Sequence, residues 1–420
     1  MNTPAPAAVP VRRHATLFIF VTVLIDAIGI GIIIPVMPDL LTELSDLPLS
    51  RAAYWGGYLS FVYAMMQFLA GPTIGNLSDR FGRRPVLLAS LAALCADYVV
   101  MGLAPTLWLL FVTRAIAGIA GATHSTANAY IADVTPPDKR AQNFGLIGAG
   151  FGLGFIVGPV IGGFAGEFGT RVPFFVAAAL AGLNVAYGLF VLPESLKAEN
   201  RRGFSWARAN PLGVARKIAA MPTIAWFFLA LFLFDLAHFV YPAIWSFYTK
   251  EAFNWSSAEI GLSLAIVGVG FAVVQGWLIR KVVPAFGEAK TAIAGFVINV
   301  AAFLGLAFAN AGWMVYAVMP LTALGAIITP ALTGIMSNRI PDDAQGELQG
   351  AMSSIAGITM IITPVMMTQL FGHFTARESL PYFPGVPFLA AALLMAAALV
   401  PFMIGLNRGA QIPTRKGKPT

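Results

Sequence analysis

Long apolar runs separated by short polar loops set the strongest limit on how this chain can fold. Each run is long enough for a helix to cross a bilayer, which takes about 20 residues. Of 420 residues, 58% are hydrophobic and 11% are charged, too few charges to cover a water-soluble fold. We therefore predict an all-α membrane protein with twelve transmembrane helices. The runs lie near residues 15–37, 54–75, 85–104, 106–132, 142–166, 172–192, 222–248, 258–280, 290–309, 312–337, 345–371 and 384–406.

The basic residues predict which side of the membrane each loop faces. All 26 lysines and arginines lie in the two tails or in alternate loops, except Arg51, Arg114, Arg171, Lys250 and Arg377. Because loops rich in lysine and arginine stay in the cytoplasm, both termini are predicted to be cytoplasmic. The net charge of +7 is then a topology signal, and we expect no nucleic-acid partner.

The polar segments divide the chain into two halves. The loops at 276–290 and 341–350 loosely repeat those at 75–86 and 136–145. Repeated halves are how many transporters rock around a central site, so we predict two pseudo-symmetric halves around a central cavity. The expected parts are a cytoplasmic tail (1–13), a six-helix bundle (14–192), a cytoplasmic linker (193–221), a second six-helix bundle (222–407) and a cytoplasmic tail (408–420).

The loop GNLSDRFGRRPV, at residues 75–86, places one acid among three arginines. Gly82 permits a tight turn, and Asp79 is suited to a specific ion pair. Asp133, at the cytoplasmic end of the fourth run, would complete a latch with Asp79 and Arg83. A basic loop that only sets topology is the alternative. The candidate cytoplasmic gate consists of Asp79, Arg80, Gly82, Arg83, Arg84 and Asp133.

Charged residues inside predicted spans indicate a role, because a charge at mid-membrane costs roughly 2.5–3.5 kcal/mol even on the mild insertion scale. Asp26, Asp97 and Arg114 lie inside the first, third and fourth spans. A guanidinium keeps its proton, so Arg114 needs water, an acid or a ligand, and Asp97 is one candidate partner. Structural ion pairing is the alternative to proton handling.

A thin polar stripe follows Arg114 along the fourth span. At 100° per residue, Ser125 and Asn128 fall within about 40° of its azimuth, which makes them candidate substrate contacts. Gln67 in the second span is a third candidate, and a hydrogen bond between helices is its alternative role.

The seventh span contains an acid and an imidazole three residues apart, Asp235 and His238. Residues at this spacing share a helix face, and such a pair can exchange a proton near neutral pH. A stabilising buried pair remains the alternative.

Glycines recur every four residues in the fifth span. This spacing lets helix backbones approach closely, although packing alone would not require the proline among them. The candidate motif is Gly154, Gly158, Pro159, Gly162 and Gly163.

These patterns resemble known transporters. The pattern G-x-L-S-D-R-x-G-R-R-P resembles the signature between helices 2 and 3 of major facilitator superfamily transporters. The run G-x-x-x-G-P-x-x-G-G resembles the antiporter motif of its drug exporters. Residues 20–190 look like the tetracycline/proton antiporters through Asp26 to Pro38, Gln67, Asp97-Tyr98, Arg114 and Asp133.

The resemblance assigns roles by matching position. In that family the acids of spans one and three and the span-four arginine serve proton and drug handling, which here implies Asp26, Asp97 and Arg114. The family also has a histidine in span eight and an aspartate in span nine, where this chain has Phe271 and Asn299. We hypothesise that Asp235 and His238 supply the missing protonation site.

The expected function is a proton-coupled efflux antiporter that exports amphipathic drugs, with tetracyclines as one option, by alternating access in the bacterial inner membrane. A proton-linked symporter or facilitator of a metabolite is the alternative, and a non-transporting sensor or scaffold is a remote one. Four histidines and one cysteine without ligand spacing predict no metal site and no enzyme activity. We expect a monomer without a cofactor; a divalent cation would travel only as a chelate with tetracycline.

Overall fold

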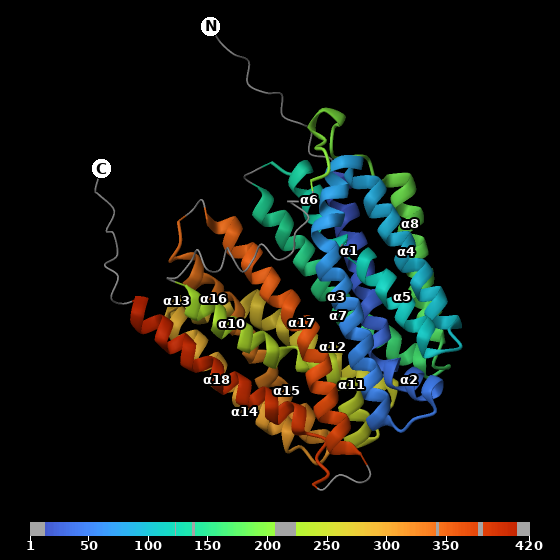
Figure 1. The fold of residues 1–420 in the computed structure, drawn as a ribbon. Coiled ribbons are helices and arrows are strands. Elements are labelled where there is room, and N and C mark those ends of the chain that lie inside the picture. Colours follow the sequence, from blue (N-terminus) through green and yellow to red (C-terminus); the bar gives the residue numbers. More distant parts are fainter. Residues whose placement is uncertain are drawn as a thin grey trace, which may run out of the picture. The chain divides into compact units, whose positions relative to one another are not determined.

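The structure, a computed structural model, describes residues 13–121, 123–136, 139–205, 224–341, 344–376 and 381–409. Every regular element in these ranges is a helix (Figure 1). The first half contains α1 (Arg13–Ile33), α2 (Met37–Ser45), α3 (Leu49–Phe81), α4 (Arg83–Leu103), α5 (Leu107–Ala120), α6 (Thr123–Val134), α7 (Arg140–Gly166) and α8 (Val172–Val191). The second half contains α10 (Ala225–His238), α11 (Val240–Phe253), α12 (Ser257–Val273), α13 (Ile279–Phe286), α14 (Glu288–Ala307), α15 (Gly312–Leu324), α16 (Ile328–Ser337), α17 (Gln345–Thr375) and α18 (Val386–Gly409).

Ten helical stretches of the described residues are long and apolar enough to cross a membrane. They coincide with ten of the predicted spans, and the chain is a multi-pass membrane protein. The predicted span at 54–75 lies inside α3, where glycine, proline and polar residues lower the hydropathy. The predicted span at 106–132 is divided into the shorter helices α5 and α6.

Several predicted spans are interrupted, whereas the sequence predicted continuous helices. Span seven is interrupted at Phe239, between α10 and α11, and span ten contains a 3-10 turn at Gly325–Ile327. Span eight passes through a π-helical turn at Val274–Leu278. Irregular backbone at membrane depth occurs only where protein buries it or where it lines a water-filled cavity. The 3-10 turn of span ten is buried and Phe239 is half-buried, so these two breaks lie inside the protein. The π-helical turn of span eight is mostly exposed, with Val274 buried.

The helices form two compact units. Unit 1 consists of Met1–Val36 and Met65–Pro211, and unit 2 consists of Met37–Ala64 and Leu212–Thr420. The chain thus enters unit 2 after Val36 and returns to unit 1 within α3. The predicted division into two six-helix bundles, with boundaries at residues 192 and 222, stays a prediction.

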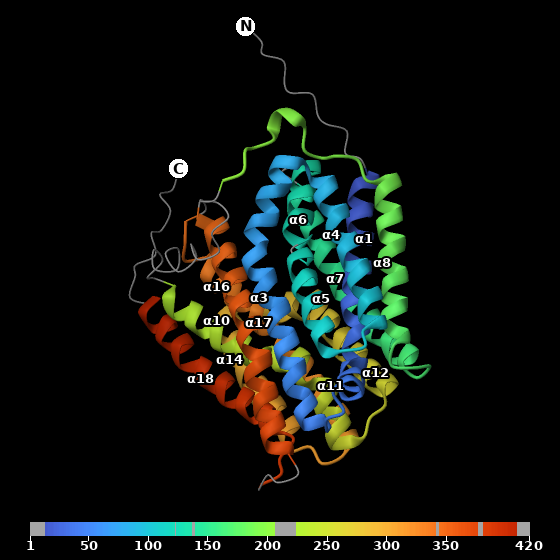
Figure 2. The same ribbon diagram turned by 45° about the vertical axis from the view of Figure 1, so that its right-hand side comes forward.

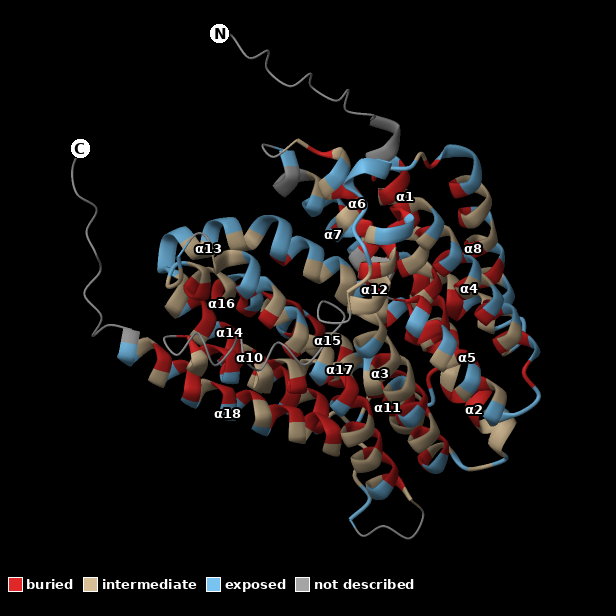
Figure 3. Ribbon diagram, turned by 45° about the horizontal axis from the view of Figure 1, so that its top comes forward, coloured by how far each residue is buried: buried red, intermediate tan, exposed pale blue. Residues whose placement is uncertain are grey.

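Unit 1 is organised around α1, which packs against α7 and α8, while α4 packs against α8 and α5. In both ribbon views α4 and α8 lie side by side (Figure 2). Lipid tails are as apolar as the side chains, so close packing rather than the hydrophobic effect holds such helices together. Accordingly, the buried residues lie mainly on helix faces that meet other helices (Figure 3).

Unit 2 is organised around α10, α14 and α18, with α17 packed against α10 and α11. Aromatic rings fill the space between these helices. Tyr241 contacts Phe303 with ring centroids 5.4 Å apart, and Phe234 contacts Phe296 at 6.2 Å. Aromatic rings are large and bury much surface when they pack together, so these contacts give unit 2 a packed interior.

Candidate functional site

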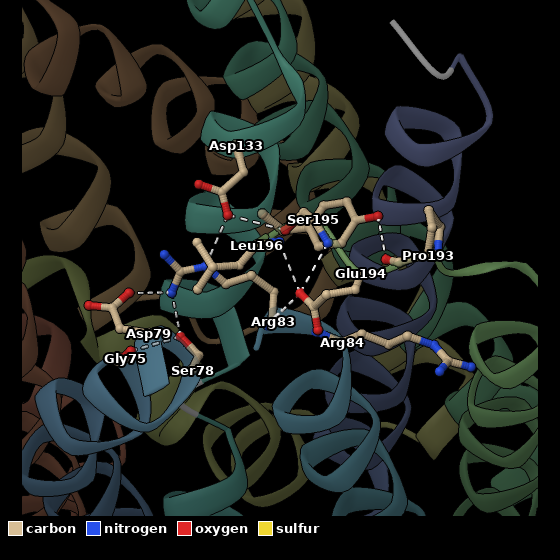
Figure 4. Close-up of polar contacts among 11 residues, drawn as sticks. Gly75, Ser78, Asp79, Arg83, Arg84, Asp133, Pro193, Glu194, Ser195 and Leu196 are labelled. Carbon is tan, nitrogen blue, oxygen red and sulfur yellow. Dashed lines mark hydrogen bonds and ion pairs between the residues drawn. The ribbon is translucent and has the colours of Figure 1, made fainter. Parts of the chain in front are cut away.

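Arg83, the first residue of α4, lies between two carboxylates (Figure 4). Its Nη1 is 2.7 Å from Oδ1 of Asp79, and its Nε is 3.1 Å from Oδ2 of Asp133. Nη1 also donates a hydrogen bond of 2.6 Å to Oγ of Ser78. Only 10% of the Arg83 side chain is exposed, against 28% for Asp79 and 24% for Asp133. The predicted contacts of this latch are confirmed, and they join the ends of α3, α4 and α6.

Gly82 makes the latch geometry possible. Its φ is 107°, a conformation that glycine adopts without strain. A Cβ at this position would also overlap the carboxylate of Glu194. With this single residue between α3 and α4, Asp79 and Arg83 meet across the turn.

Glu194, which the sequence analysis did not select, binds the start of α4. Its Oε1 accepts a 2.8 Å hydrogen bond from the backbone N–H of Arg83, and its Oε2 accepts a 3.3 Å bond from that of Arg84. An acid at this place satisfies free N–H groups and interacts favourably with the helix dipole. The next residue, Ser195, donates to Oδ2 of Asp133 at 3.1 Å. The segment after α8 therefore contacts both sides of the latch.

The start of the predicted linker continues along the same turn. The backbone N–H of Arg202 donates to the carbonyl oxygen of Asp79 at 3.0 Å. Nδ2 of Asn76 donates to the carbonyl oxygen of Ser205 at 2.6 Å. These two bonds hold residues 201–205 against the end of α3.

The other two arginines of the predicted gate lie outside the ion cluster. Arg80 is exposed, with its guanidinium 5.1 Å from the ring centroid of Phe81. Arg84 donates a 2.7 Å hydrogen bond from Nη2 to the carbonyl oxygen of Leu189, in the last turn of α8. Only Arg83 bridges the acids.

A second ion pair, between Arg114 of α5 and Asp97 of α4, lies inside the membrane-spanning part of unit 1. Nη2 of Arg114 contacts Oδ2 of Asp97, and their side chains are 14% and 1% exposed. Oδ1 of Asp97 is buried and has no hydrogen-bond partner among the described residues. Since an unsatisfied buried oxygen is costly, this atom is suited to accept a proton or a water molecule.

Asp26 lies half-buried on α1, the helix most closely bound to α7. Three residues further on, a Cβ at Gly29 would lie 2.8 Å from the hydroxyl of Tyr98. Tyr98 follows Asp97 directly on α4. The close contact of α1 and α4 therefore occurs next to the buried ion pair.

The glycines of α7 lie directly on the backbone of α1. A Cβ on Gly154 would be 2.8 Å from the carbonyl oxygen of Leu24, and one on Gly158 would be 2.6 Å from that of Ile28. A Cβ on Gly162 would overlap the carbonyl group one turn further along α1. Successive contacts lie four residues apart on both α1 and α7. The close packing predicted from the glycine spacing is therefore confirmed. The proline ring of the motif touches Gly31 of α1, and Gly163 is buried on α7.

The candidate substrate contacts are not brought together as predicted. Nε2 of Gln67 donates a 3.0 Å hydrogen bond to the carbonyl oxygen of Gly121, at the end of α5. This contact is the bond between helices that was the alternative role of Gln67. Ser125 and Asn128 belong to α6, beyond the break, so a stripe continued from Arg114 along one helix is wrong. Asn128 is exposed, and the side chain of Ser125 lies outside the described residues.

In unit 2, Asp235 and His238 occupy the last turn of α10, before the break at Phe239. No hydrogen bond or ion pair joins the two side chains in the part of the chain that is described, so the predicted acid–imidazole pair is not formed. The imidazole instead stacks on Phe234, with centroids 5.4 Å apart. Its Nδ1 is buried without a hydrogen-bond partner among the described residues.

Asn299 of α14 is a second buried polar group in this region. It is fully buried, and neither amide atom has a hydrogen-bond partner among the described residues. A Cβ on Gly325 would overlap its amide group, so the side chain faces the 3-10 turn of span ten. Nearby, the hydroxyl of Tyr241 donates to Oγ1 of Thr322 at 3.3 Å. Unit 2 thus contains unsatisfied polar atoms within an aromatic interior.

Comparison with known proteins agrees with this geometry. Residues 19–364 and 227–419 match the family model of the Major Facilitator Superfamily. The chain belongs to the major facilitator superfamily. As a member of this superfamily it is a transporter of small molecules that works in a membrane.

Several relatives within the superfamily are named tetracycline resistance proteins. The class C protein of Escherichia coli is 40% identical over 400 residues, covering 95% of this chain and 98% of that protein. The class G protein of Vibrio anguillarum is 37% identical over 359 residues, covering 86% and 91%. The crystal structure of the human organic anion transporter MFSD10 (TETRAN) is similar in fold, with a TM-score of 0.69 at 21% identity over 94% of this chain and 100% of that one.

Proposed function

We propose that this major facilitator transporter is a proton-coupled antiporter that exports amphipathic drugs, tetracyclines first among them. The relatives named tetracycline resistance proteins support the substrate class, because the similarity extends over nearly their whole length. The proposed setting is the bacterial inner membrane, with both termini in the cytoplasm and a single chain as the working unit. The proton gradient is the energy source.

The buried pair of Asp97 and Arg114 is the observation that carries proton coupling. A proton that binds Oδ1 of Asp97 neutralises the carboxylate and weakens its attraction to Arg114. Arg114 cannot lose its own proton, and weakening the interaction of a buried cation with its acid is costly. Arg114 then binds a further negative group, such as an oxygen of the substrate, more strongly. One arginine can in this way make proton binding and drug binding depend on each other, as antiport requires.

Asp26 and the polar groups of unit 2 are proposed as further members of the proton path. Asp26 lies on α1, close to where α1 contacts the helix that carries Asp97. His238 and Asn299 have unsatisfied buried atoms, which a water molecule or a substrate group could satisfy. Neutral Asn299 offers hydrogen bonds, while His238 can also bind a proton.

The latch around Arg83 is proposed as the cytoplasmic gate. It would be closed when the substrate site opens outward, and its opening would admit drug from the cytoplasm. Ion pairs with about a quarter of each carboxylate exposed suit this task, because water can compensate the charges once the contacts separate.

The decisive experiment uses inverted membrane vesicles, in which respiration acidifies the interior. An antiporter accumulates tetracycline there and releases it when an uncoupler is added. A symporter would not accumulate its substrate in this orientation, and a facilitator would ignore the uncoupler. If no drug in an amphipathic panel shows gradient-dependent accumulation, the proposed function is wrong.

A neutralising variant identifies the proton site in the same assay. We expect Asp97→Asn to lose most gradient-driven accumulation. Glu199→Gln is the matched control, because its side chain is 74% exposed and contacts neither the latch nor the buried pair in the structure.

A further inference from the structure

Residues 37–64 are the part of the first half that groups with unit 2. They comprise α2 and the first half of α3, and the chain on both sides of them belongs to unit 1. In Figures 1 and 2 the lower half of α3 lies beside α17. We call residues 37–64 the crossing segment. Hydrogen bonds, an ion pair and a close helix contact hold it against unit 2.

Asp39 of α2 binds two residues of unit 2. Its Oδ1 is 2.5 Å from Nζ of Lys250, near the end of α11, and each side chain is 29% exposed. Its Oδ2 accepts a 3.3 Å hydrogen bond from Oγ of Ser257, the first residue of α12. Both carboxylate oxygens of Asp39 therefore have a partner at the corner between α11 and α12.

The corner between α11 and α12 is built to present these two partners. Asn254 ends α11 in the left-handed conformation, with a φ of 54°. Ser256 then starts α12 with a capping box, in which its hydroxyl accepts from the N–H of Glu259 and the Glu259 carboxylate accepts from the N–H of Ser256. Such caps fix the direction in which a helix begins, so Lys250 and Ser257 are held on one side of the corner.

The first half of α3 fits α17 closely. A Cβ on Gly57 would overlap Oγ1 of Thr368, which is 1% exposed. One residue further along each helix, Nε2 of Gln369 donates a 2.8 Å hydrogen bond to the hydroxyl of Tyr58. The crossing segment thus covers Thr368, and any movement of the segment away from α17 must uncover it.

We propose that Asp39, Lys250 and Ser257 form the extracytoplasmic gate of the transporter, which opens when the crossing segment leaves α17. The placement on that face follows from the proposed topology, so this inference rests on the proposed function. The pair is partly exposed, and an ion pair of this kind contributes little enough to break in every cycle. Gly57 itself contributes no side chain to its contact with Thr368.

The test measures how fast a cysteine at position 368 reacts with a membrane-impermeant maleimide added outside intact cells. The background is Cys95→Ser with Thr368→Cys, and no drug is present. Adding Asp39→Asn, or Lys250→Gln as a second route to the same loss, is expected to raise the reaction rate about two- to fivefold, the population shift expected for losing a partly exposed ion pair. Exchanging the charges, with Asp39→Lys and Lys250→Asp together, should bring the rate back toward that of the background.

Tyr382→Phe is the matched control, because it removes a 2.7 Å hydrogen bond to Glu251 on the same end of α11 without touching the crossing segment. Burial raises the pKa of Tyr382, so its phenol keeps the proton that it donates. The control should react at the background rate. Membrane levels of every variant are compared by immunoblot to correct for the amount of folded protein.

The gate is refuted if both neutralising variants react at the background rate, or if the control reacts as fast as they do. A charge exchange that leaves the rate raised would show that the pairing itself is not what closes the site. Because the readout needs neither drug nor gradient, a failure of the gate is distinct from a failure of drug export, which the vesicle assay reports.

Discussion

Replacing Arg83 by glutamine should open the latch that Arg83 forms with Asp79 and Asp133. The change removes contacts of 2.7 Å to Asp79, 3.1 Å to Asp133 and 2.6 Å to Ser78. It also leaves two carboxylates facing each other without a cation between them.

The size of the effect follows from burial. Removing one partner of a fully buried ion pair costs about 3–5 kcal/mol. Here the acids remain 28% and 24% exposed, so water compensates part of the loss, and we expect about 2–3 kcal/mol. At tenfold per 1.4 kcal/mol, the equilibrium between closed and open latch would shift about 30- to 150-fold.

The assay measures drug accumulation in inverted vesicles together with the reactivity of a cysteine placed at the cytoplasmic end of α6, in a Cys95→Ser background. Arg83→Gln should lower accumulation strongly and raise reactivity. Arg83→Lys should give an intermediate result, because an ammonium group keeps the charge but cannot reproduce the directed bonds of a guanidinium.

Arg80→Gln is the matched control. It removes the same charge from the same turn, but Arg80 is exposed and stands over Phe81 rather than between acids. Its effect should be less than about twofold. If Arg83→Gln and Arg80→Gln behave alike, the loop is only a topology signal and the latch has no gating role.

The remaining predictions concern packing, capping and the interior of unit 2. Gly158→Val should lower the amount of protein in the membrane by placing a side chain onto α1, at a cost of about 3 kcal/mol, while Gly152→Val should not, since a Cβ there meets no atom within 4 Å. Glu194→Gln should lower thermal stability in detergent by about 1 kcal/mol, and an unchanged melting temperature would contradict its capping role. Asn299→Leu should keep or raise the thermal stability in detergent, because it removes two unsatisfied polar atoms. The same change should lower gradient-driven drug uptake, and unchanged uptake would show that Asn299 has no role in transport.

Local patterns predicted the parts of the site that depend on nearby residues. Gly82 and the spacing of Asp79 and Arg83 predicted a turn with an ion pair across it. The glycines of α7 predicted close packing against another helix. The charge of Arg114 needed water, an acid or a ligand, and Asp97 was one of the few acids inside the spans of the first half.

The parts that the sequence did not reveal depend on distant residues or on helix breaks. Glu194 meets Arg83 across 111 positions, and nothing in the local sequence links Asp39 to Lys250. The break at Phe239 lies three residues before Pro242. This proline has no N–H to donate to the carbonyl oxygen of His238, and its ring clashes with that carbonyl, so α10 ends at His238. The prediction of a continuous span overlooked this local signal. His238 stacks on Phe234 instead of pairing with Asp235 as predicted.

The most direct test of the account follows both fluxes at once. Purified protein is reconstituted in liposomes with a pH-sensitive dye inside, and tetracycline is added outside without an imposed gradient. If the protein exchanges drug for protons, drug uptake makes the interior more alkaline, because protons leave as drug enters. Asp97→Asn is predicted to abolish this proton movement. Drug uptake by the unaltered protein without any movement of protons would contradict the account.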